Sequence, residues 1–158
     1  MHFFSPVPKM PLVEIIVTKK TSPVVASAVF DLASKMGKQI IVVGDGPGFY
    51  TTRILSFQIA EALNLLAEGA RTEHIDGALE RFGLPVGSIT LLDEIGIDVG
   101  QHIMEVLSDA FGSRIQIPKE MEAIAKEGRK GRKNANGFYT YKDGKKEGPD
   151  SSIYKHFA

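Results

Sequence analysis

Residues 11–43, PLVEIIVTKKTSPVVASAVFDLASKMGKQIIVV, carry two different patterns, which predict a strand, a helix and a second strand. Residues 11–17 are apolar and rich in β-branched side chains, as is typical of a buried strand, and residues 40–43 repeat that composition. Between them, residues 21–23 supply a helix cap followed by proline, and Gly37 supplies a helix end. A strand, a helix and a strand within about 35 residues predict one βαβ unit and therefore a parallel sheet.

The predicted sheet is too small to be self-sufficient, because two strands cannot cover both faces of a parallel sheet. We expect no further strand that could extend it, although residues 137–141 are expected to be extended. Something else must therefore lie beside this unit. The helix between the strands is predicted to present one apolar face, made of Val25, Ala28, Val29, Leu32, Ala33 and Met36.

After the glycine-rich turn at residues 44–48 the pattern becomes helical. The chain is therefore predicted to be an α/β part followed by an all-helical part, mostly helix overall, with a boundary near residue 47. Thr72 is the predicted cap of one of these helices. The predicted helices cover residues 49–68, 72–82, 88–95 and 97–111, and a last one begins at Pro118 and ends near Gly128.

Composition excludes several classes of protein. The 158 residues include 19 basic and 19 acidic side chains, so no net charge attracts the chain to nucleic acid. Cysteine is absent, which excludes disulfides, thiolate metal sites and a cysteine nucleophile. No apolar run approaches the roughly 20 residues of a membrane span, and the first residues lack a signal-peptide pattern. We expect a cytoplasmic protein.

His2 and Glu14 are the first candidate site. A neutral imidazole accepts a proton from a hydroxyl near neutral pH, and a carboxylate on its other nitrogen fixes the tautomer and stabilises the imidazolium. The two residues can meet if the proline-rich loop between them folds back on the strand. The alternative is a frayed terminal histidine and a glutamate at a strand edge.

Two loops suggest phosphate binding, each with a plainer alternative. Residues 44–49 follow a strand and precede a helix, but they read Gly-x-Gly-x-x-Phe. The sixth position, which is a glycine in a dinucleotide-binding turn, is therefore a phenylalanine. An interdomain turn explains them as well. Residues 128–137 place four cations in a flexible loop, which suits a phosphate or pyrophosphate but equally suits a solvated basic tail.

The remaining polar residues are interpreted as structural. His74 and His102 have no partner at metal-ligand spacing, so no metal site is predicted. Asp93 and Glu94 are taken to be ordinary helical acids, and the Phe and Tyr residues are taken to be mostly core.

Taken in series, several motifs resemble the L-3-hydroxyacyl-CoA dehydrogenase family, and most of all the dehydrogenase part of the multifunctional fatty acid oxidation complex alpha subunit. The resemblance covers nearly the whole chain in the right order. The motifs are His2–Pro6 with Leu12–Glu14, Asp45–Arg53, Phe82–Gly87, Leu92–Gly96, and Gly131–Asn134 with Gly137–Tyr139.

The resemblance implies an NAD-binding Rossmann domain followed by a helical domain, with the active site between them. Residues 1–47 would be the last part of the Rossmann domain and residues 48–158 the helical dehydrogenase domain. Most of the NAD site would then be missing, and the chain would be the back part of a larger enzyme, inactive alone. That enzyme would oxidise L-3-hydroxyacyl-CoA to 3-oxoacyl-CoA with NAD in fatty acid β-oxidation.

The family's site residues carry over by position. His2 matches the catalytic base and Glu14 its acidic partner. Ser5 stands where many members have an asparagine near cofactor and substrate, and Thr52 where many have an asparagine near the substrate. Both are departures in which a hydroxyl replaces an amide. Lys133 matches a lysine that approaches NAD.

The resemblance also implies partners. These are an acyl-CoA substrate, a second copy of the chain bound through the helical domain, and a thiolase beta subunit in the complex, with an added enoyl-CoA hydratase activity in the parent. The alternative function is a non-catalytic helical dimerisation or interaction module. It would use the apolar faces of the helices at residues 49–68 and 97–111.

Overall fold

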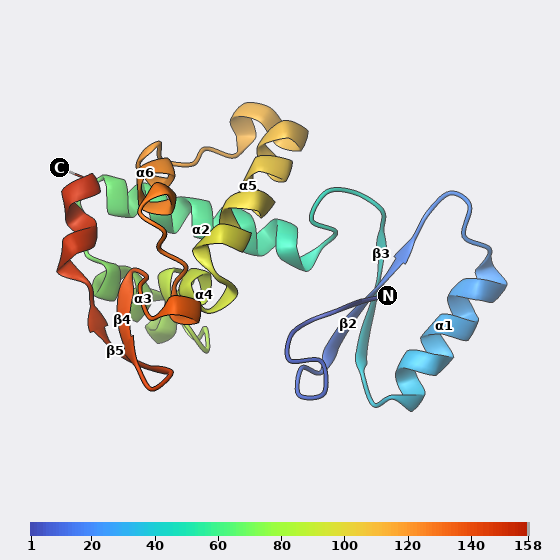
Figure 1. Ribbon diagram of the computed structural model, residues 1–158. Coiled ribbons are helices and arrows are strands. Elements are labelled where there is room, and N and C mark those ends of the chain that lie inside the picture. Colours follow the sequence, from blue (N-terminus) through green and yellow to red (C-terminus); the bar gives the residue numbers. More distant parts are fainter. Residues whose placement is uncertain (158) are drawn as a thin grey trace. The chain divides into compact units, whose positions relative to one another are not determined.

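The computed structural model of the protein describes residues 1–157 and divides into two compact units, Met1–Arg53 and Ile54–Ala158 (Figure 1). Helix predominates, and the strand content is small, as the sequence predicts. The elements of unit 1 are β1 (His2–Phe3), β2 (Leu12–Val17), α1 (Pro23–Lys35) and β3 (Gln39–Gly44). Helix α2 (Thr51–Ala67) begins at the end of unit 1 and continues into unit 2.

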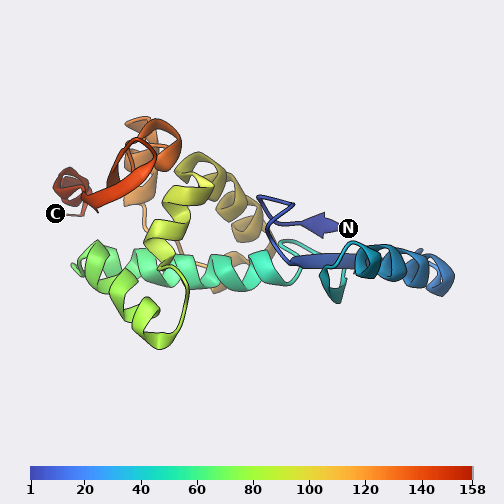
Figure 2. The same cartoon turned by 90° about the horizontal axis from the view of Figure 1, so that it is seen from below.

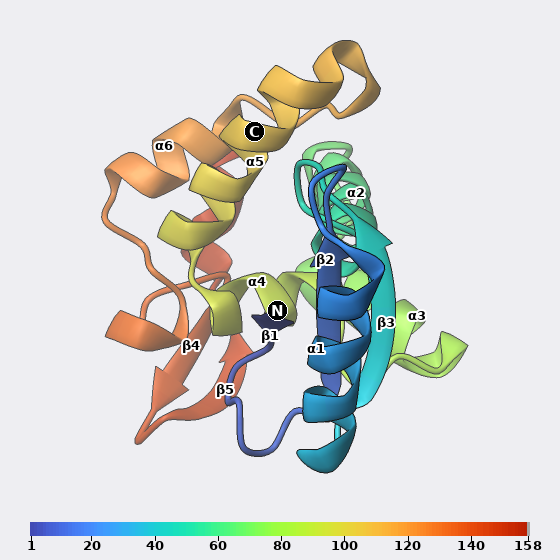
Figure 3. The ribbon, with the colours of Figure 1, turned by 90° about the vertical axis from the view of Figure 1, so that its right-hand side faces the viewer.

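The predicted βαβ unit is confirmed. β2 and β3 are parallel neighbours, with Leu12 opposite Gln39, and α1 connects them and lies along the sheet (Figure 3). The expectation that no further strand extends this sheet is wrong, because β1 pairs antiparallel with β2 and the order is β1-β2-β3. A strand of two residues is too short to show a period in the sequence.

Helix α1 begins as predicted, because the Ser22 hydroxyl accepts a hydrogen bond from the Val25 N–H at 3.3 Å. Its predicted apolar face is only partly buried. Ala33 is fully buried against Val13 and Ile15 of β2, whereas Leu32 is 50% exposed. The sheet of unit 1 is too narrow to cover the whole face, as its small number of strands leads us to expect.

Unit 2 is a set of helices followed by a hairpin (Figure 2). The predictions for residues 72–82, 88–95 and 97–111 agree with the observed bounds, and the last helix begins two residues after Pro118. β4 and β5 form an antiparallel hairpin, of which the sequence predicted only the extended first strand. The elements after α2 are α3 (Thr72–Phe82), α4 (Ser88–Ile95), α5 (Ile97–Phe111), α6 (Glu120–Lys126), β4 (Tyr139–Lys142) and β5 (Lys145–Pro149), with short 3₁₀ turns at Gly112–Arg114, Arg132–Asn134 and Ser151–His156.

One apolar core holds unit 2 together. It is built from the inner faces of the helices and from the aromatic residues of the hairpin, which confirms that much of the aromatic content is core material. Its most deeply buried large apolar residues are Leu63, Leu66, Ile89, Ile97, Leu107, Ile124, Phe138 and Ile153.

The predicted cap at Thr72 is wrong. Thr72 is the first helical residue of α3, and Arg71 holds the cap position without a side-chain hydrogen bond. The Thr72 hydroxyl instead donates to Glu73 and lies 3.2 Å from the Tyr154 hydroxyl. The neighbouring Glu73 and a partly buried partner far along the chain, Tyr154, therefore determine the use of this side chain.

The interpretation of Asp93 as an ordinary helical acid is also wrong. Asp93 is fully buried, and its carboxylate accepts hydrogen bonds from the Phe138 and Tyr139 N–H groups and from the Tyr141 hydroxyl, at 3.0, 3.0 and 3.1 Å. Burial raises its pKa to about 6, and the nearby Asp76 charge adds to the rise, although the donors oppose it. Near neutral pH, Asp93 is thus an ionised acceptor that fastens the hairpin to α4.

Asp76 does the same for the start of α4. Its carboxylate accepts from the N–H groups of Ile89 and Thr90, both at 2.9 Å, and from the Tyr139 hydroxyl at 2.9 Å. These N–H groups belong to the first turn of α4, where a helix has unpaired donors and favours negative charge. A cap supplied by another helix therefore locks α3, α4 and β4 together.

We expect the Asp93 interactions to dominate the stability of unit 2. Tyr141→Phe removes one donor and should lower the free energy of unfolding by about 1–2 kcal/mol, whereas Asp93→Asn turns an amide N–H toward backbone donors and should cost about 3 kcal/mol or more. Urea unfolding measures both. Tyr50→Phe is the matched control, because the Tyr50 side chain is 56% exposed. Equal stability of all variants would contradict this role.

Candidate active site

His2 and Glu14 lie opposite each other in the sheet. β1 runs antiparallel to β2 with His2 in register with Glu14, which brings both side chains to the same face. The His2 Nδ1 atom lies 2.7 Å from the Glu14 Oε2 atom. The fold therefore brings together the two residues that the sequence singled out, and the loop between them folds back as that pairing requires.

The second oxygen of Glu14 binds the start of α2. Glu14 Oε1 accepts the N–H groups of Tyr50 at 3.2 Å and of Thr51 at 2.8 Å. The carboxylate is fully buried, which opposes its ionisation, but the hydrogen bonds from Thr51, His2 and Tyr50 outweigh burial and lower the pKa of Glu14 below its usual value. Glu14 is thus held as an anion between an imidazole and a helix N-terminus.

This arrangement sets the chemistry open to His2. When ionised Glu14 accepts a hydrogen bond from the Nδ1–H group, the neutral imidazole keeps its lone pair on Nε2, a tautomer that we assign from this hydrogen bond. The His2 side chain is 35% exposed, whereas Glu14 is inaccessible. The pair is therefore a partly accessible base with a buried orienting anion.

The other predicted site residues are placed less tightly. Ser5 is exposed in the loop after β1, and Thr52 is partly buried in the first turn of α2, directly after the Thr51 that binds Glu14. Lys133 belongs to unit 2, where its Nζ atom lies 2.9 Å from the Asp98 carboxylate at the start of α5. His2, Glu14 and Thr52 thus share one small region, and Lys133 has its own anionic partner.

The turn at residues 44–49 does not fit a pyrophosphate. A phosphate at this position would need the free N–H groups at the start of α2, and Glu14 already binds those of Tyr50 and Thr51. Sequence reasoning did not predict this contact. The strand, glycine-rich turn and helix indicated an anion at the start of α2, but only the fold shows that this anion is the Glu14 carboxylate of β2.

Ion pairs inside unit 2 neutralise most of the basic loop. Arg129 is buried and bonds Glu127, Asp150, the Ser152 hydroxyl and the Gly137 carbonyl. Arg132 pairs with Glu94 and Lys133 with Asp98. At least three of the loop's four cations therefore have structural anionic partners, which favours neither a free phosphate site nor a merely solvated tail.

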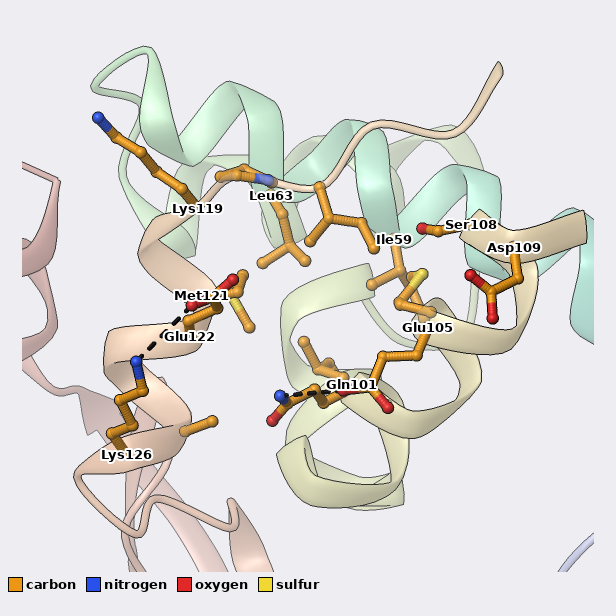
Figure 4. A pocket seen from close by; sticks show the side chains of 16 residues that line it. Ile59, Leu63, Gln101, Glu105, Ser108, Asp109, Lys119, Met121, Glu122 and Lys126 are labelled. Atoms are coloured by element: carbon orange, nitrogen blue, oxygen red, sulfur yellow. Dashed lines mark hydrogen bonds and ion pairs between the residues drawn. The ribbon is translucent and has the colours of Figure 1, made fainter. Parts of the chain in front are cut away.

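Unit 2 has a groove of about 640 Å³ between α2, α5 and α6 (Figure 4). Its lining includes the apolar side chains of Ile59, Leu63 and Met121 together with charged side chains of α5 and α6. None of the predicted site residues is among the described residues that line it. The described lining of this groove therefore contains neither His2 nor Glu14.

Two further findings concern the described residues as a whole. Among residues 1–157, no group of three or more His, Asp or Glu side chains is arranged to hold a metal ion. Within the same range, no helix combines the length and the apolar character that a bilayer crossing requires.

Comparison with known proteins agrees with this organisation. Residues 1–46 match the family model of the 3-hydroxyacyl-CoA dehydrogenase NAD binding domain, and residues 48–141 match that of its C-terminal domain. The fatty acid oxidation complex subunit alpha of Shewanella sp. (strain ANA-3) is 50% identical over 159 residues, which cover 98% of this chain and 22% of that protein. The chain thus spans about a fifth of the length of this curated relative.

Solved structures give the same result. (S)-3-Hydroxybutyryl-CoA dehydrogenase PaaH1 from Ralstonia eutropha is 39% identical, with a TM-score of 0.85 over 90% of this chain and 52% of its own. The 3-hydroxybutyryl-CoA dehydrogenase from Escherichia coli K12 is 33% identical, with a TM-score of 0.83 over 88% of this chain and 30% of its own. The chain belongs to the 3-hydroxyacyl-CoA dehydrogenase family. This is an oxidoreductase family whose matched N-terminal domain is described as NAD-binding.

The lowered pKa of Glu14 predicts a pH-dependent contribution to stability. The ionised carboxylate stabilises the fold at pH values above its ordinary pKa, and this stabilisation is lost as the pH falls through the lower folded-state pKa. Glu14→Gln should therefore lower the free energy of unfolding by about 1.5–3 kcal/mol near neutral pH, and by less near about pH 3. Urea unfolding at both pH values tests this, with the exposed Glu61→Gln as control. A pH-independent difference would refute the assignment.

Proposed function

We propose that residues 1–158 supply the general base and the helical domain of an enzyme that oxidises L-3-hydroxyacyl-CoA to 3-oxoacyl-CoA in fatty acid β-oxidation. The observation that supports this most directly is the 2.7 Å contact between His2 Nδ1 and Glu14 Oε2, in a chain that matches both domains of the family. The proposal takes residues 1–47 as the end of the nucleotide-binding domain and residues 48–158 as the helical domain.

In the proposed reaction, His2 Nε2 accepts the proton of the substrate's 3-hydroxyl group. The electron pair of that O–H bond forms the new carbonyl as the C3–H bond breaks. Bound NAD would supply the acceptor for the hydride that leaves C3. The positive charge that develops on the imidazole lies beside ionised Glu14, which stabilises it without itself taking the proton.

The remaining predicted residues would bind rather than react. The hydroxyl groups of Ser5 and Thr52 can each exchange hydrogen bonds with a substrate oxygen, and we assign Ser5 a second role near the cofactor. Lys133 is proposed to approach NAD, and its 42% exposed side chain leaves room for a ligand despite the bond to Asp98. The structure assigns none of these three roles by a contact of its own.

The residues present fit only a small part of an NAD site. The N–H groups of Tyr50 and Thr51, which directly follow the glycine turn at residues 44–49, bind Glu14 rather than a ligand. We therefore propose that the rest of the nucleotide site comes from outside residues 1–158, and that these residues alone do not turn over substrate. From the family resemblance, a cytoplasmic setting, a thiolase beta partner and an added enoyl-CoA hydratase activity are further proposals.

The activity test compares two proteins. One is the 158-residue chain, and the other is an extended protein in which the upstream segment of the Shewanella relative precedes it. With NAD and 3-hydroxybutyryl-CoA, the extended protein should form NADH, and the chain alone should not. His2→Gln in the extended protein should lower kcat at least about 100-fold, as loss of a general base does.

His102→Gln is the matched control, because the His102 side chain is 79% exposed on α5. Strong NADH formation by the chain alone would refute its incompleteness. An undiminished rate in His2→Gln would refute the assignment of the base.

The second candidate function is self-association through unit 2. The outer face of α5 carries Val99 and Val106, which are 40% and 46% exposed, with the partly buried Ile103 between them. This spacing forms an apolar stripe along one side of a helix. It favours a second copy of the chain as the partner, because a matching stripe on each copy forms an isologous contact.

Sedimentation equilibrium tests the association. The chain should show a reversible dimer, and Val106→Glu should weaken dimerisation at least about tenfold, because it places a charge in an apolar contact. Glu105→Gln, at the exposed neighbouring position, should leave the dimer intact. A clean monomer at high concentration would eliminate this function without affecting the dehydrogenase proposal.

A further inference from the structure

The His2 imidazole contacts two aromatic rings in addition to the Glu14 carboxylate. The Phe4 ring lies 4.8 Å from it, centroid to centroid, at 65° in an edge-to-face arrangement. The Phe49 ring lies 5.5 Å from it at 55°. Neither phenylalanine belongs to the apolar core of Val13, Ile15 and Ala33 or to its described neighbours. Their contact with His2 is therefore not a by-product of core packing.

Phe49 holds its position at a conformational cost. Its φ of 45° lies in the left-handed region, which bulky side chains avoid and glycine enters freely. The Phe49 N–H donates to the Gly46 carbonyl at 3.0 Å and closes the turn. A glycine would satisfy this backbone with less strain, so the phenyl ring itself requires an explanation.

The same turn serves both members of the pair. The residues that follow Phe49, Tyr50 and Thr51, donate their N–H groups to Glu14, while the Phe49 ring contacts His2. The backbone thus positions the anion and the side chain positions the base. Any movement of this turn changes both contacts together.

We propose that Phe49 is a positioning residue for His2. Together with Phe4, its ring restricts rotation of the imidazole about χ2, so that Nδ1, and not the carbon on the opposite edge, faces Glu14. The Nε2 lone pair is then held in one direction. This inference rests on the proposed function for its catalytic consequence, but not for its geometry.

The decisive variant is Phe49→Gly, which keeps the left-handed backbone accessible and removes the ring. In the 158-residue chain, ¹⁵N NMR of His2 near neutral pH should change from one dominant tautomer to averaged nitrogen shifts, with faster exchange of the Nδ1 proton. In the extended protein, kcat should fall about tenfold while KM for the acyl-CoA changes less than about twofold, because only orientation of the base is lost.

Two further variants keep the test sharp. Phe49→Tyr retains the ring and should restore both the tautomer signature and most of kcat, which a general loss of stability would not allow. Phe30→Leu, a partly exposed position on α1, is the control for loss of an aromatic ring in unit 1. If Phe49→Gly does not fold, Phe49→Leu, which is apolar and non-aromatic, takes its place in both measurements.

Wild-type nitrogen shifts and wild-type kcat in both Phe49→Gly and Phe49→Leu would overturn the inference. Averaged shifts in the chain would support it even if the extended wild-type protein proved inactive. That inactivity would instead count against the proposed function, so the two failures are distinguishable.

Discussion

The hydrogen bonds that the buried carboxylate of Glu14 accepts are the interaction on which unit 1 depends. One of its oxygens accepts from the His2 imidazole, and the other accepts from the first N–H groups of α2. A carboxylate without access to water is stable only if its lone pairs are used in this way. The need to satisfy one buried anion therefore joins a strand, a terminal histidine and a helix start into a single site.

Unit 2 uses the same device twice for structure instead of chemistry. Asp76 of α3 accepts hydrogen bonds from the first backbone N–H groups of α4, and Asp93 accepts hydrogen bonds from backbone N–H groups at the start of the hairpin. The difference lies in the partners. The donors around Asp93 and Asp76 are backbone, tyrosine and threonine groups, none of which has a basic nitrogen, whereas the donor to Glu14 is an imidazole with a second ring nitrogen that can act as an acceptor. What distinguishes Glu14 in the candidate active site from the structural Asp76 and Asp93 is therefore its hydrogen-bond partner, and not its burial.

Local patterns predicted most elements well, and the failures come from strands without a strand pattern and from long-range partners. The limits of α1, α4 and α5 follow from apolar periodicity and glycine ends, which act within a few residues. Strand β1 was missed because two residues show no period, and the second hairpin strand because its sequence, KKEGP, is polar and mostly exposed. The use of Thr72 was missed because its partner Tyr154 lies far along the chain. The site shows the same division. The types of His2 and Glu14 pointed to base chemistry, but the role of Phe49 needs a backbone angle that no pattern displays.

The sequence by itself determined the chemical inventory: an imidazole, an acid in a β-branched run, no thiol, no net charge, and motifs in the order of one dehydrogenase family. Only the tertiary structure decided which groups meet. It paired His2 with Glu14 in antiparallel register, bound the N–H groups of Tyr50 and Thr51 to a carboxylate instead of a phosphate, and neutralised much of the basic loop internally. The physical reason is that hydrogen bonds and ion pairs are formed between atoms close in space, and sequence spacing constrains that closeness only within a turn or two.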